Sequence, residues 1–394
     1  MTKNSKDIVI TSALRSPIGS YKGALKEVKA DQLGTICIKE TLSRSNLRPE
    51  EIDEIVLGQI LTSGEGQNPA RQASINAGIP NTTPAHIVNQ LCGSGLRAII
   101  SGYQLLMLDD ANIVITGGQE NMSRSPHTIL YRLDKKLDKN KLVDSMINDG
   151  LVDAFNNYHM GVTAENVARK FNITREQQDE FALDSQKKAS LANSQKRFDD
   201  EIININLNNN KKIVLDKDEY PKKNISIEDL KKLKAIFEEN GTVTSGNSSG
   251  LNDAAAIVVL MKRGTAEKKN QKIFAKIKSW ANSGVDPSIM GIGPIPATKL
   301  ALKKAGWKIE DIDLFEINEA FAAQSLAVIK ELNIQKEKVN VNGGAIALGH
   351  PIGASGARIL VTLLHEMEKR NLKKGLATLC VGGGMGIALC LERD

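Results

Sequence analysis

The chain has 394 residues, of which 41% are apolar, so it is long enough for two or three domains with a sizeable core. The net charge of +6 comes from lysine-rich stretches (135–141, 211–223 and 262–272) that Asp, Glu or Asn interrupt and that hold few aromatic side chains. Bases would find little to stack on, so we expect no nucleic-acid partner. No stretch approaches the roughly 18 apolar residues of a membrane span, so we expect no membrane partner.

Four cysteines are present, Cys37, Cys92, Cys380 and Cys390. No pair has C-x-x-C spacing, and none lies near a histidine at the spacing of metal ligands, so we expect neither a metal site nor a disulfide framework. Sparse cysteine usage is typical of reduced thiols. The apolar run at Ile8–Ile10 is too short for a signal peptide, and we therefore expect a cytoplasmic protein.

Three segments recur in the same order at nearly the same offset. The pairs are 47–57 with 307–317, 94–100 with 355–361, and 113–118 with 379–384. The offsets are 260, 261 and 266 residues, which favours an internal duplication over chance similarity.

Each copy alternates helical and strand patterns. In chain order we expect helices over 35–47, 95–108, 297–306 and 356–369, and short buried strands over 113–116 and 377–381. This alternation predicts an α/β protein with a mixed sheet and helices on both faces.

The copies differ after their glycine pairs. In the second copy, Gly382–Gly386 turns directly into a last strand, 387–391, whereas the equivalent strand of the first copy, 254–261, follows Gly117-Gly118 only after about 130 residues. Residues 119–250 are interpreted as an insertion that is polar, rich in lysine and irregular. Insertions at strand ends commonly carry binding surfaces.

Cys92 follows an apolar strand and precedes Gly93-Ser94-Gly95 and a helix. A cysteine at the N-terminus of a helix is expected to favour the thiolate, because the helix dipole and free N–H groups stabilise negative charge. Cys92 is therefore a candidate nucleophile. The alternative is a small, inert core cysteine.

His350 occupies the corresponding turn of the second copy, between Gly349 and Pro351. If the copies pack face to face, this turn faces that of Cys92. The imidazole could then accept the thiol proton and donate to a thioester oxygen. The alternative is a satisfied surface histidine.

Cys380 lies at a strand end before glycines, and Gly382 is free to offer its N–H group. A second thiolate there could remove a proton alpha to a thioester carbonyl, although a core cysteine is an equally good interpretation. Asn318 could orient a water, but an Asx turn or helix cap is favoured. Cys37 and Cys390 fit a core role better.

His159 and Ser249 lie in or beside the insertion. Both side chains could line a cleft. By spacing alone, each is more simply a turn residue.

The segments Asn89–Gly95, Gly343–Gly356 and Leu379–Gly386 resemble the three signature motifs of the thiolases of the biosynthetic acetyl-CoA acetyltransferase type. The likeness runs nearly end to end. It implies a duplicated five-layer α-β-α-β-α fold with an inserted loop domain. The N-terminal half would comprise 1–120 plus 250–272, the loop domain 121–249 and the C-terminal half 273–394.

The resemblance also implies roles. Cys92 would be acylated, and His350 would activate it and hold the thioester oxygen together with a water on Asn318. Cys380 would move the alpha proton, and the N–H groups of Cys92 and Gly382 would form a second oxyanion hole.

Further residues would line a pantetheine channel, namely His159, Met160, Ser249, Met290, Ala320 and Phe321. Met160 after His159 is typical of members that act on short acyl chains. Lys222 would meet the nucleotide end of the coenzyme. Lys222 and Asp229 stand where relatives often carry Arg and Ser, and a lysine lacks the bidentate phosphate recognition of arginine.

The implied reaction is the reversible condensation of two acetyl-CoA to acetoacetyl-CoA and CoA, without metal or redox cofactor. A degradative 3-ketoacyl-CoA thiolase with broader chain length is the alternative. A ketoacyl synthase is disfavoured by Cys380. A non-catalytic CoA-binding module would lack Cys92, His350 or Cys380, and all three are present. A redox sensor whose two thiols pair is a further alternative. The family forms homo-oligomers, tetramers or dimers, and the loop near 124–141 resembles the segment that joins dimers.

Overall fold

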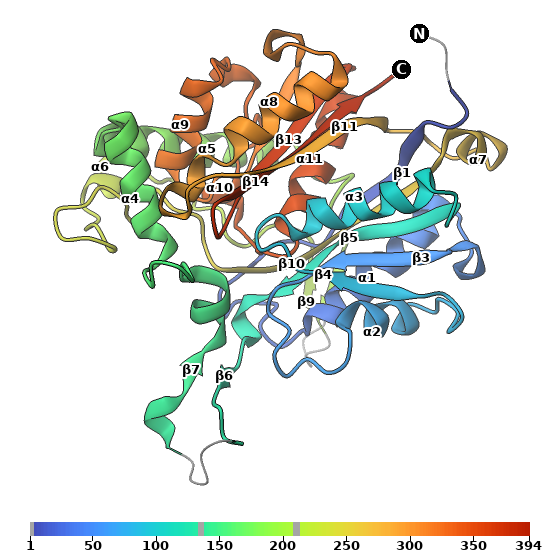
Figure 1. Ribbon diagram of the computed structural model, residues 1–394, viewed down its shortest axis with the longest axis horizontal. Coiled ribbons are helices and arrows are strands. Elements are labelled where there is room, and N and C mark those ends of the chain that lie inside the picture. The colour runs from blue at the N-terminus through green and yellow to red at the C-terminus, as the bar shows by residue number, and fades with distance from the viewer. Residues whose placement is uncertain (1–3, 133–137, 208–212) are drawn as a thin grey trace.

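The computed structural model describes residues 4–132, 138–207 and 213–394 (Figure 1). Its centre is one mixed sheet of ten strands. In spatial order the path runs β12 (Leu314–Ile317), β13 (Lys374–Val381), β14 (Met385–Glu392), β11 (Ala275–Gly284), β1 (Ile8–Arg15), β10 (Asn252–Lys262), β5 (Ile113–Asn121), β3 (Glu54–Gly58) and β4 (Ala85–Val88), with β2 (Gly19–Ser20) paired to β10.

The sheet consists of two halves that repeat the same strand order. The order β1-β10-β5-β3 in the first half corresponds to β11-β14-β13-β12 in the second, with parallel pairs at the outer end of each. The halves meet where Val9 and Ile10 of β1 pair with β11. In the second half, Val339 forms a parallel bridge with Phe315 of β12, and it takes the position that β4 has beside β3 in the first half. The repeated order confirms the duplication inferred from the sequence.

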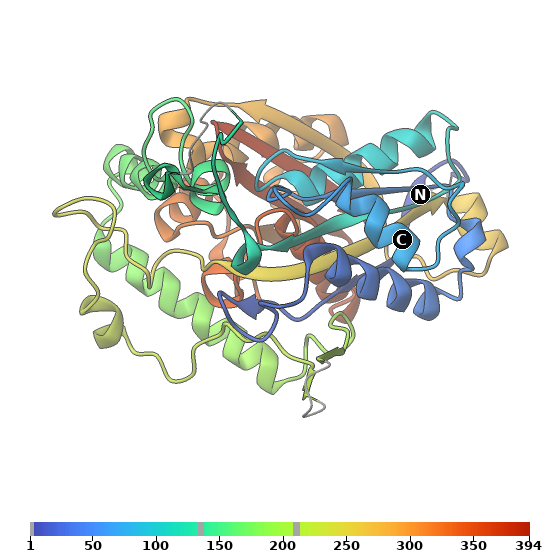
Figure 2. The ribbon, with the colours of Figure 1, turned by 90° about the horizontal axis from the view of Figure 1, so that it is seen from below.

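Helices form three layers around this sheet (Figures 1 and 2). The first half is covered by α1 (Ala30–Ser45) and α2 (Pro69–Asn76), and the second by α8 (Pro294–Ala305) and α9 (Ala322–Glu331). Helices α3 (Ser94–Met107) and α11 (Ser355–Lys369) pack against each other and against both halves of the sheet. The two halves of the sheet form the two β layers, and the α3–α11 pair lies between them. The predicted five-layer α-β-α-β-α arrangement is therefore confirmed.

The two central helices approach closely at their N-termini because the second residue of each is a glycine. A Cβ on Gly356 would lie 2.3 Å from the backbone nitrogen of Leu96, and one on Gly95 would lie 2.7 Å from that of Ala357. Such distances exclude a side chain at either position. The turns that precede α3 and α11 are thereby brought to one region, as the repeat predicted.

Strand β5 differs from the expectation that Gly117-Gly118 forms a turn. The strand continues through both glycines to Asn121, and it pairs along its whole length with β10. A Cβ on Gly118 would lie 2.3 Å from the carbonyl oxygen of Gly353. Glycine occurs here because backbone of the second half packs directly on the strand.

The segment between β5 and β10 is more regular than predicted. It contains α4 (Met160–Phe171), α5 (Arg175–Ser194), α6 (Ile227–Lys231) and the short strands β6 (His127–Thr128), β7 (Val143–Asp144), β8 (Ile205–Leu207) and β9 (Ile213–Leu215). Helix α5 starts with a capping box, in which Thr174 and Gln177 satisfy each other's backbone N–H groups. Strands β6 and β7 form an arm that extends from the body (Figure 1).

The remaining helices are short, α7 (Arg263–Lys268) and α10 (Ala345–Leu348). The largest apolar cluster lies between the sheet and the α3–α11 pair, and it joins residues of both halves. Cys37 and Cys390 are buried, as expected of core cysteines. Across the described residues, no helix has the length and apolar character needed to cross a membrane.

Candidate active site

Cys92 lies on a tight turn between β4 and α3. Leu91 adopts a left-handed conformation with φ of 45°, and the Ser94 hydroxyl closes the turn. The Ser94 Oγ accepts from the Gln90 N–H (2.8 Å) and donates to the Leu91 carbonyl (2.7 Å). Of the four cysteines, Cys92 alone is partly exposed. The turn therefore leaves the Cys92 sulfur partly exposed, unlike the other three cysteines.

The free thiol, not the thiolate, is the resting form of Cys92. Burial of the sulfur raises the pKa of Cys92 to about 11, and the negative charge of Glu120 adds to the shift. The backbone N–H groups of Gly382 and of Cys92 itself oppose it. The expectation that the helix start favours a thiolate is wrong, because desolvation outweighs these hydrogen bonds. Attack by this sulfur requires a base.

His350 is fixed as a neutral imidazole with one defined tautomer. Its Nδ1 lies 2.5 Å from the Ser355 Oγ, and that hydroxyl lies 2.9 Å from the Pro351 carbonyl. A carbonyl only accepts, so the hydroxyl hydrogen points to Pro351 and Nδ1–H donates to Ser355. Burial lowers the pKa of His350 to about 3, and the charge of Arg358 lowers it further. Nε2 is therefore left as a proton acceptor.

The side-chain amide of Asn318 faces the ring of His350, and both residues belong to the second half. Its backbone N–H donates to the Thr378 carbonyl (3.0 Å), and its Nδ2 lies 3.4 Å from the His350 Nε2. Its Oδ1 is buried and has no hydrogen-bond partner within the described part of the chain. The favoured alternative, an Asx turn or helix cap, is wrong because the amide points at the histidine. A free buried acceptor of this kind suits a bound water.

Cys380 is buried near the end of β13, in an apolar cluster that also contains several predicted channel residues. The cluster comprises Met160, Ala164, Val243, Met290, Ala320, Phe321 and Cys380, with Phe237 packed against it. Burial raises the pKa of Cys380, and the nearby Cys92 sulfur raises it further. The two cysteines therefore lie close enough to interact electrostatically.

His159 has two roles. Its Nδ1 accepts from the Gly161 N–H (3.0 Å) and so caps α4, and its ring stacks on Phe237 with centroids 4.6 Å apart. Phe237 in turn meets Phe321 edge to face at 6.2 Å. The interpretation of His159 as a turn residue agrees with its capping contact, and the stacking of its ring on Phe237 is an additional contact. No sequence pattern indicated Phe237, an isolated aromatic residue between α6 and β10.

The backbone of Ser249 contacts Ala320 of the apolar cluster around Cys380, whereas Lys222 lies outside that cluster. The Ser249 N–H donates to the Ala320 carbonyl (3.0 Å). Lys222 is exposed beside α5, where its N–H donates to the Gln186 Oε1 (3.0 Å) at a cavity of ≈ 350 Å³. Asp229 is engaged in capping α6, with its carboxylate accepting from Ser226.

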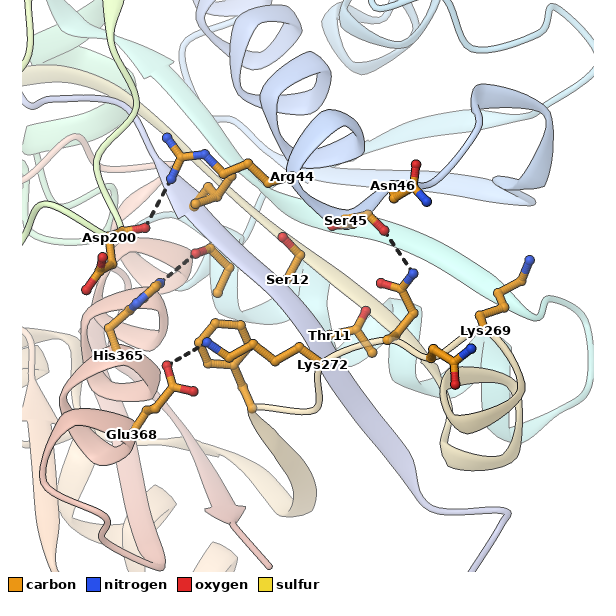
Figure 3. A pocket seen from close by; sticks show the side chains of 15 residues that line it. Thr11, Ser12, Arg44, Ser45, Asn46, Asp200, Lys269, Lys272, His365 and Glu368 are labelled. Carbon is orange, nitrogen blue, oxygen red and sulfur yellow. Dashed lines mark hydrogen bonds and ion pairs between the residues drawn. The ribbon is translucent and has the colours of Figure 1, made fainter.

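A cavity of ≈ 800 Å³ lies away from all the predicted site residues (Figure 3). Thr11, Ser12, Arg44, Lys272 and His365 are among its lining residues. Its charged groups already have partners: Lys272 pairs with Glu368 inside the cavity, and Arg44, Lys269 and Asp200 pair with Glu40, Glu51 and Lys369 outside it. No group of His, Cys, Asp and Glu side chains in the described ranges could hold a metal ion.

Comparisons with known proteins agree with the fold and with the motifs. Residues 8–264 match the thiolase N-terminal domain, and residues 271–393 match the thiolase C-terminal domain. The acetyl-CoA acetyltransferase of Chromobacterium violaceum is 54% identical over 390 residues, which is 98% of this chain and 100% of that protein. The cytosolic acetyl-CoA acetyltransferase of Rattus norvegicus is 51% identical over 396 residues, 100% of both chains.

Solved structures show the same likeness. The crystal structure of the Bacillus anthracis acetyl-CoA acetyltransferase superposes with a TM-score of 0.96 at 45% identity, over 98% of each chain. That of the human mitochondrial 3-ketoacyl-CoA thiolase superposes with a TM-score of 0.95 at 39% identity, over 99% of each chain. With both family domains matched across almost its whole length, the chain belongs to the thiolase family.

Proposed function

We propose that this protein is an acetyl-CoA C-acetyltransferase, which condenses two acetyl-CoA molecules reversibly to acetoacetyl-CoA and CoA through an acetyl-Cys92 intermediate. One observation supports it above all. The half-buried Cys92 sulfur accepts the Gly382 N–H on one side and lies beside a second buried thiol, Cys380. The relatives at 51–54% identity that carry the name acetyl-CoA acetyltransferase support the same reaction.

In the first half-reaction, Cys92 attacks the thioester carbonyl while its proton passes to the His350 Nε2. A thiol with a pKa of about 11 and an imidazole with a pKa of about 3 do not form a stable ion pair, so the proton moves as the sulfur bonds to carbon. Nε2–H then donates to the developing oxyanion, with a water held by Asn318. The same proton passes on to the departing CoA sulfur.

In the second half-reaction, the Cys380 thiol first releases its own proton to solvent, and the resulting thiolate removes a methyl proton from a second acetyl-CoA. Burial raises the pKa of Cys380, which makes its thiolate a stronger base for a weakly acidic carbon. Acetylation of Cys92 removes one of the two causes of that shift. The enolate attacks the acetyl carbon, the N–H groups of Cys92 and Gly382 hold the oxyanion, and the proton on Cys380 passes to the leaving Cys92 sulfur.

Substrate contacts follow from the apolar cluster around Cys380. Pantetheine would lie against His159, Phe237 and Ser249, and bulky Met160, Met290 and Phe321 favour short acyl chains. Lys222 would meet the coenzyme phosphates. No metal or redox cofactor is needed for these steps. The degradative 3-ketoacyl-CoA thiolase alternative is not favoured.

We propose a homo-oligomer, a tetramer or a dimer, in the cytoplasm. The outer edge of β4 pairs with no described strand, and an open edge is a template for a second copy. The loop at 124–141 would join dimers, although residues 133–137 of it lie outside the described residues. Residues 121–249 would act as the loop domain between the halves 1–120 plus 250–272 and 273–394.

The test is to incubate purified protein with acetyl-CoA and follow CoA release and acetoacetyl-CoA formation. Cys92→Ala should form no acetyl-enzyme and no product, whereas Cys37→Ala, which removes a buried core thiol, should retain both. Absence of product from the wild type, together with no thiolysis of acetoacetyl-CoA by CoA, would reject the proposal.

A further inference from the structure

Glu120 is a fully buried acid that none of the steps above uses. It lies at the end of β5, and its side chain reaches two loops from different halves. Its Oε1 accepts from the Leu61 N–H (3.2 Å), and its Oε2 accepts from the N–H groups of Ile60 (3.1 Å) and Gly353 (2.9 Å). One carboxylate thus ties the loop after β3 to the loop that carries His350.

Both tied loops border the reacting groups. Ile60 and Leu61 pack in the same apolar cluster as Ile352, with Cys92 against them. Gly353 lies between His350 and its partner Ser355. A shift of either loop would therefore change the position of the imidazole relative to the sulfur.

The hydrogen-bonding chemistry at Glu120 admits only an acceptor. All three donors are backbone N–H groups, which cannot reverse, so a protonated acid or an amide would direct a hydrogen at a donor. The neighbouring buried acid Asp253 differs. It accepts from the N–H and from the hydroxyl of Ser123, and a hydroxyl can reverse to accept from an amide.

We propose that Glu120 is a positioning residue for the acylation of Cys92, whose carboxylate holds the Ile60–Leu61 loop and the His350 loop in the register that the proton transfer needs. The proposal deepens the proposed function and rests on it. Misplacement of a reacting group by about 1 Å can lower a rate on the order of 10²-fold, so the hydrogen bonds that fix these two loops can control the rate of acetylation.

The same carboxylate also acts on Cys92 through its charge. Its negative charge raises the pKa of Cys92, so its removal should make the sulfur easier to ionise while leaving it worse placed. Burial raises the pKa of Glu120 to about 7, and Asp253 on β10 adds to the shift. Asp253 itself, also raised by burial, has a pKa of about 6.

These values define a pH window. His350 titrates at about 3 and Cys92 at about 11, so neither changes its charge between pH 5 and 8, whereas Glu120 and Asp253 do. Glu316, the buried partner of Arg358, also titrates near this range, because burial raises its pKa to about 8. The clamp needs the carboxylate, so it is complete above the pKa of Glu120 and is lost as the pH falls below it. The acetylation rate of the wild type should therefore fall on acidification through about pH 7.

The experiment compares Glu120→Gln with Asp253→Asn in the full-length protein. Two readouts are taken from pH 5 to 9: single-turnover acetylation by acetyl-CoA, followed by mass spectrometry, and alkylation of Cys92 by iodoacetamide, with Cys92→Ala as background. For Glu120→Gln we expect acetylation to fall on the order of 10²-fold at pH 8. Alkylation of Cys92 at pH 9 should become faster, because the negative charge that adds to the raised pKa of Cys92 is removed. Asp253→Asn should leave acetylation at pH 8 unchanged.

The unfolding midpoint in urea separates positioning from general loss of structure, because an unfolded chain would expose Cys92 and speed its alkylation as well. A positioning role predicts slow acetylation of a Glu120→Gln protein that is still folded under the assay conditions. Equal acetylation by Glu120→Gln and the wild type would overturn the proposal. If Glu120→Gln does not fold, the wild type and Asp253→Asn decide, because a rate that stays flat from pH 8 to 5 in both overturns it. If the wild type is never acetylated, the proposed function has failed, whereas the change in alkylation still reports the influence of Glu120 on Cys92.

Discussion

The turn before α3 and the turn before α11 occupy equivalent places in the two halves, yet they are built for different tasks. Ser94 and Ser355 are equivalent residues. The Ser94 hydroxyl bonds only backbone, at Gln90 and Leu91, and so shapes the turn. The Ser355 hydroxyl instead accepts a hydrogen bond from the imidazole of His350. The nucleophile is held by its backbone and stays partly exposed, whereas the base is held by its ring.

Burial separates the two turns further. The chain that returns from the insertion covers the second turn, because Leu251 bridges to His350 and the Asn252 Oδ1 accepts its N–H (2.8 Å). Cys92 receives only the Gly382 N–H from the other half. The returning chain lies near both turns, because Leu251 also packs with Met146 and Leu151 of the insertion in the apolar cluster that contacts Cys92, but Cys92 stays partly exposed whereas His350 is buried. One duplicated frame yields two different environments because a single long segment breaks its symmetry.

The largest expected loss comes from a residue outside the two turns. Cys380→Ser should abolish condensation, by on the order of 10³-fold or more, because a serine hydroxyl is far too weak an acid to supply the base. Acetylation of Cys92 should persist. Mass spectrometry of the acetyl-enzyme and an acetoacetyl-CoA assay measure the two steps. Cys390→Ser, in the adjacent strand β14, is the control and should keep both, and normal condensation by Cys380→Ser would refute the base assignment.

Removal of the base tests whether the second turn serves the first. His350→Ala should slow acetylation of Cys92 on the order of 10³-fold, because the thiol loses the base that the mechanism assigns to it. The exposed His86 is the control, since His86→Ala should acetylate at the wild-type rate. Comparable acetylation in both variants would show that the sulfur is activated without the imidazole.

Stability should depend on the close contact that brings the turns together. Gly356→Ala would place Cβ at 2.3 Å from the Leu96 nitrogen, and we expect a loss of about 3 kcal/mol in the free energy of unfolding. Gly306→Ala is matched, because Gly306 has φ of 71° and open space, and only the left-handed backbone costs about 1 kcal/mol. Denaturant unfolding compares them, and equal losses would mean that the helix contact can relax.

The smallest effect distinguishes the two serines directly. Ser355→Ala leaves the buried His350 Nδ1–H without its partner, and we expect acetylation to fall about tenfold and the free energy of unfolding to fall by about 1 kcal/mol. Ser94→Ala should lower the free energy of unfolding by a similar ~1 kcal/mol, because it loses the hydroxyl that closes the turn, but it should leave the acetylation rate nearly unchanged. Rates from rapid-quench acetylation and unfolding midpoints measure the pair. Identical profiles for the two variants would contradict the division of tasks.

Much of this site could be read from the sequence. The repeated segments indicated the duplication, and the glycines around Cys92, His350 and Cys380 marked turns at strand and helix ends, because glycine patterns report local backbone needs. The alternation of elements predicted a mixed sheet with helices on both faces, and the five-layer arrangement followed from the family resemblance alone. Boundaries were less accurate, as α1 starts at Ala30 although the pattern began at Thr35.

The sequence by itself determined the repeat, the order of the elements and which residue types could react, since these depend on neighbours along the chain. Tertiary structure alone decided the protonation states of Cys92 and His350, because burial sets the cost of charge. It also decided that Asn318 faces the imidazole and that Phe237 stacks on His159. Those contacts join segments far apart in the sequence, and no local pattern encodes the packing that places them.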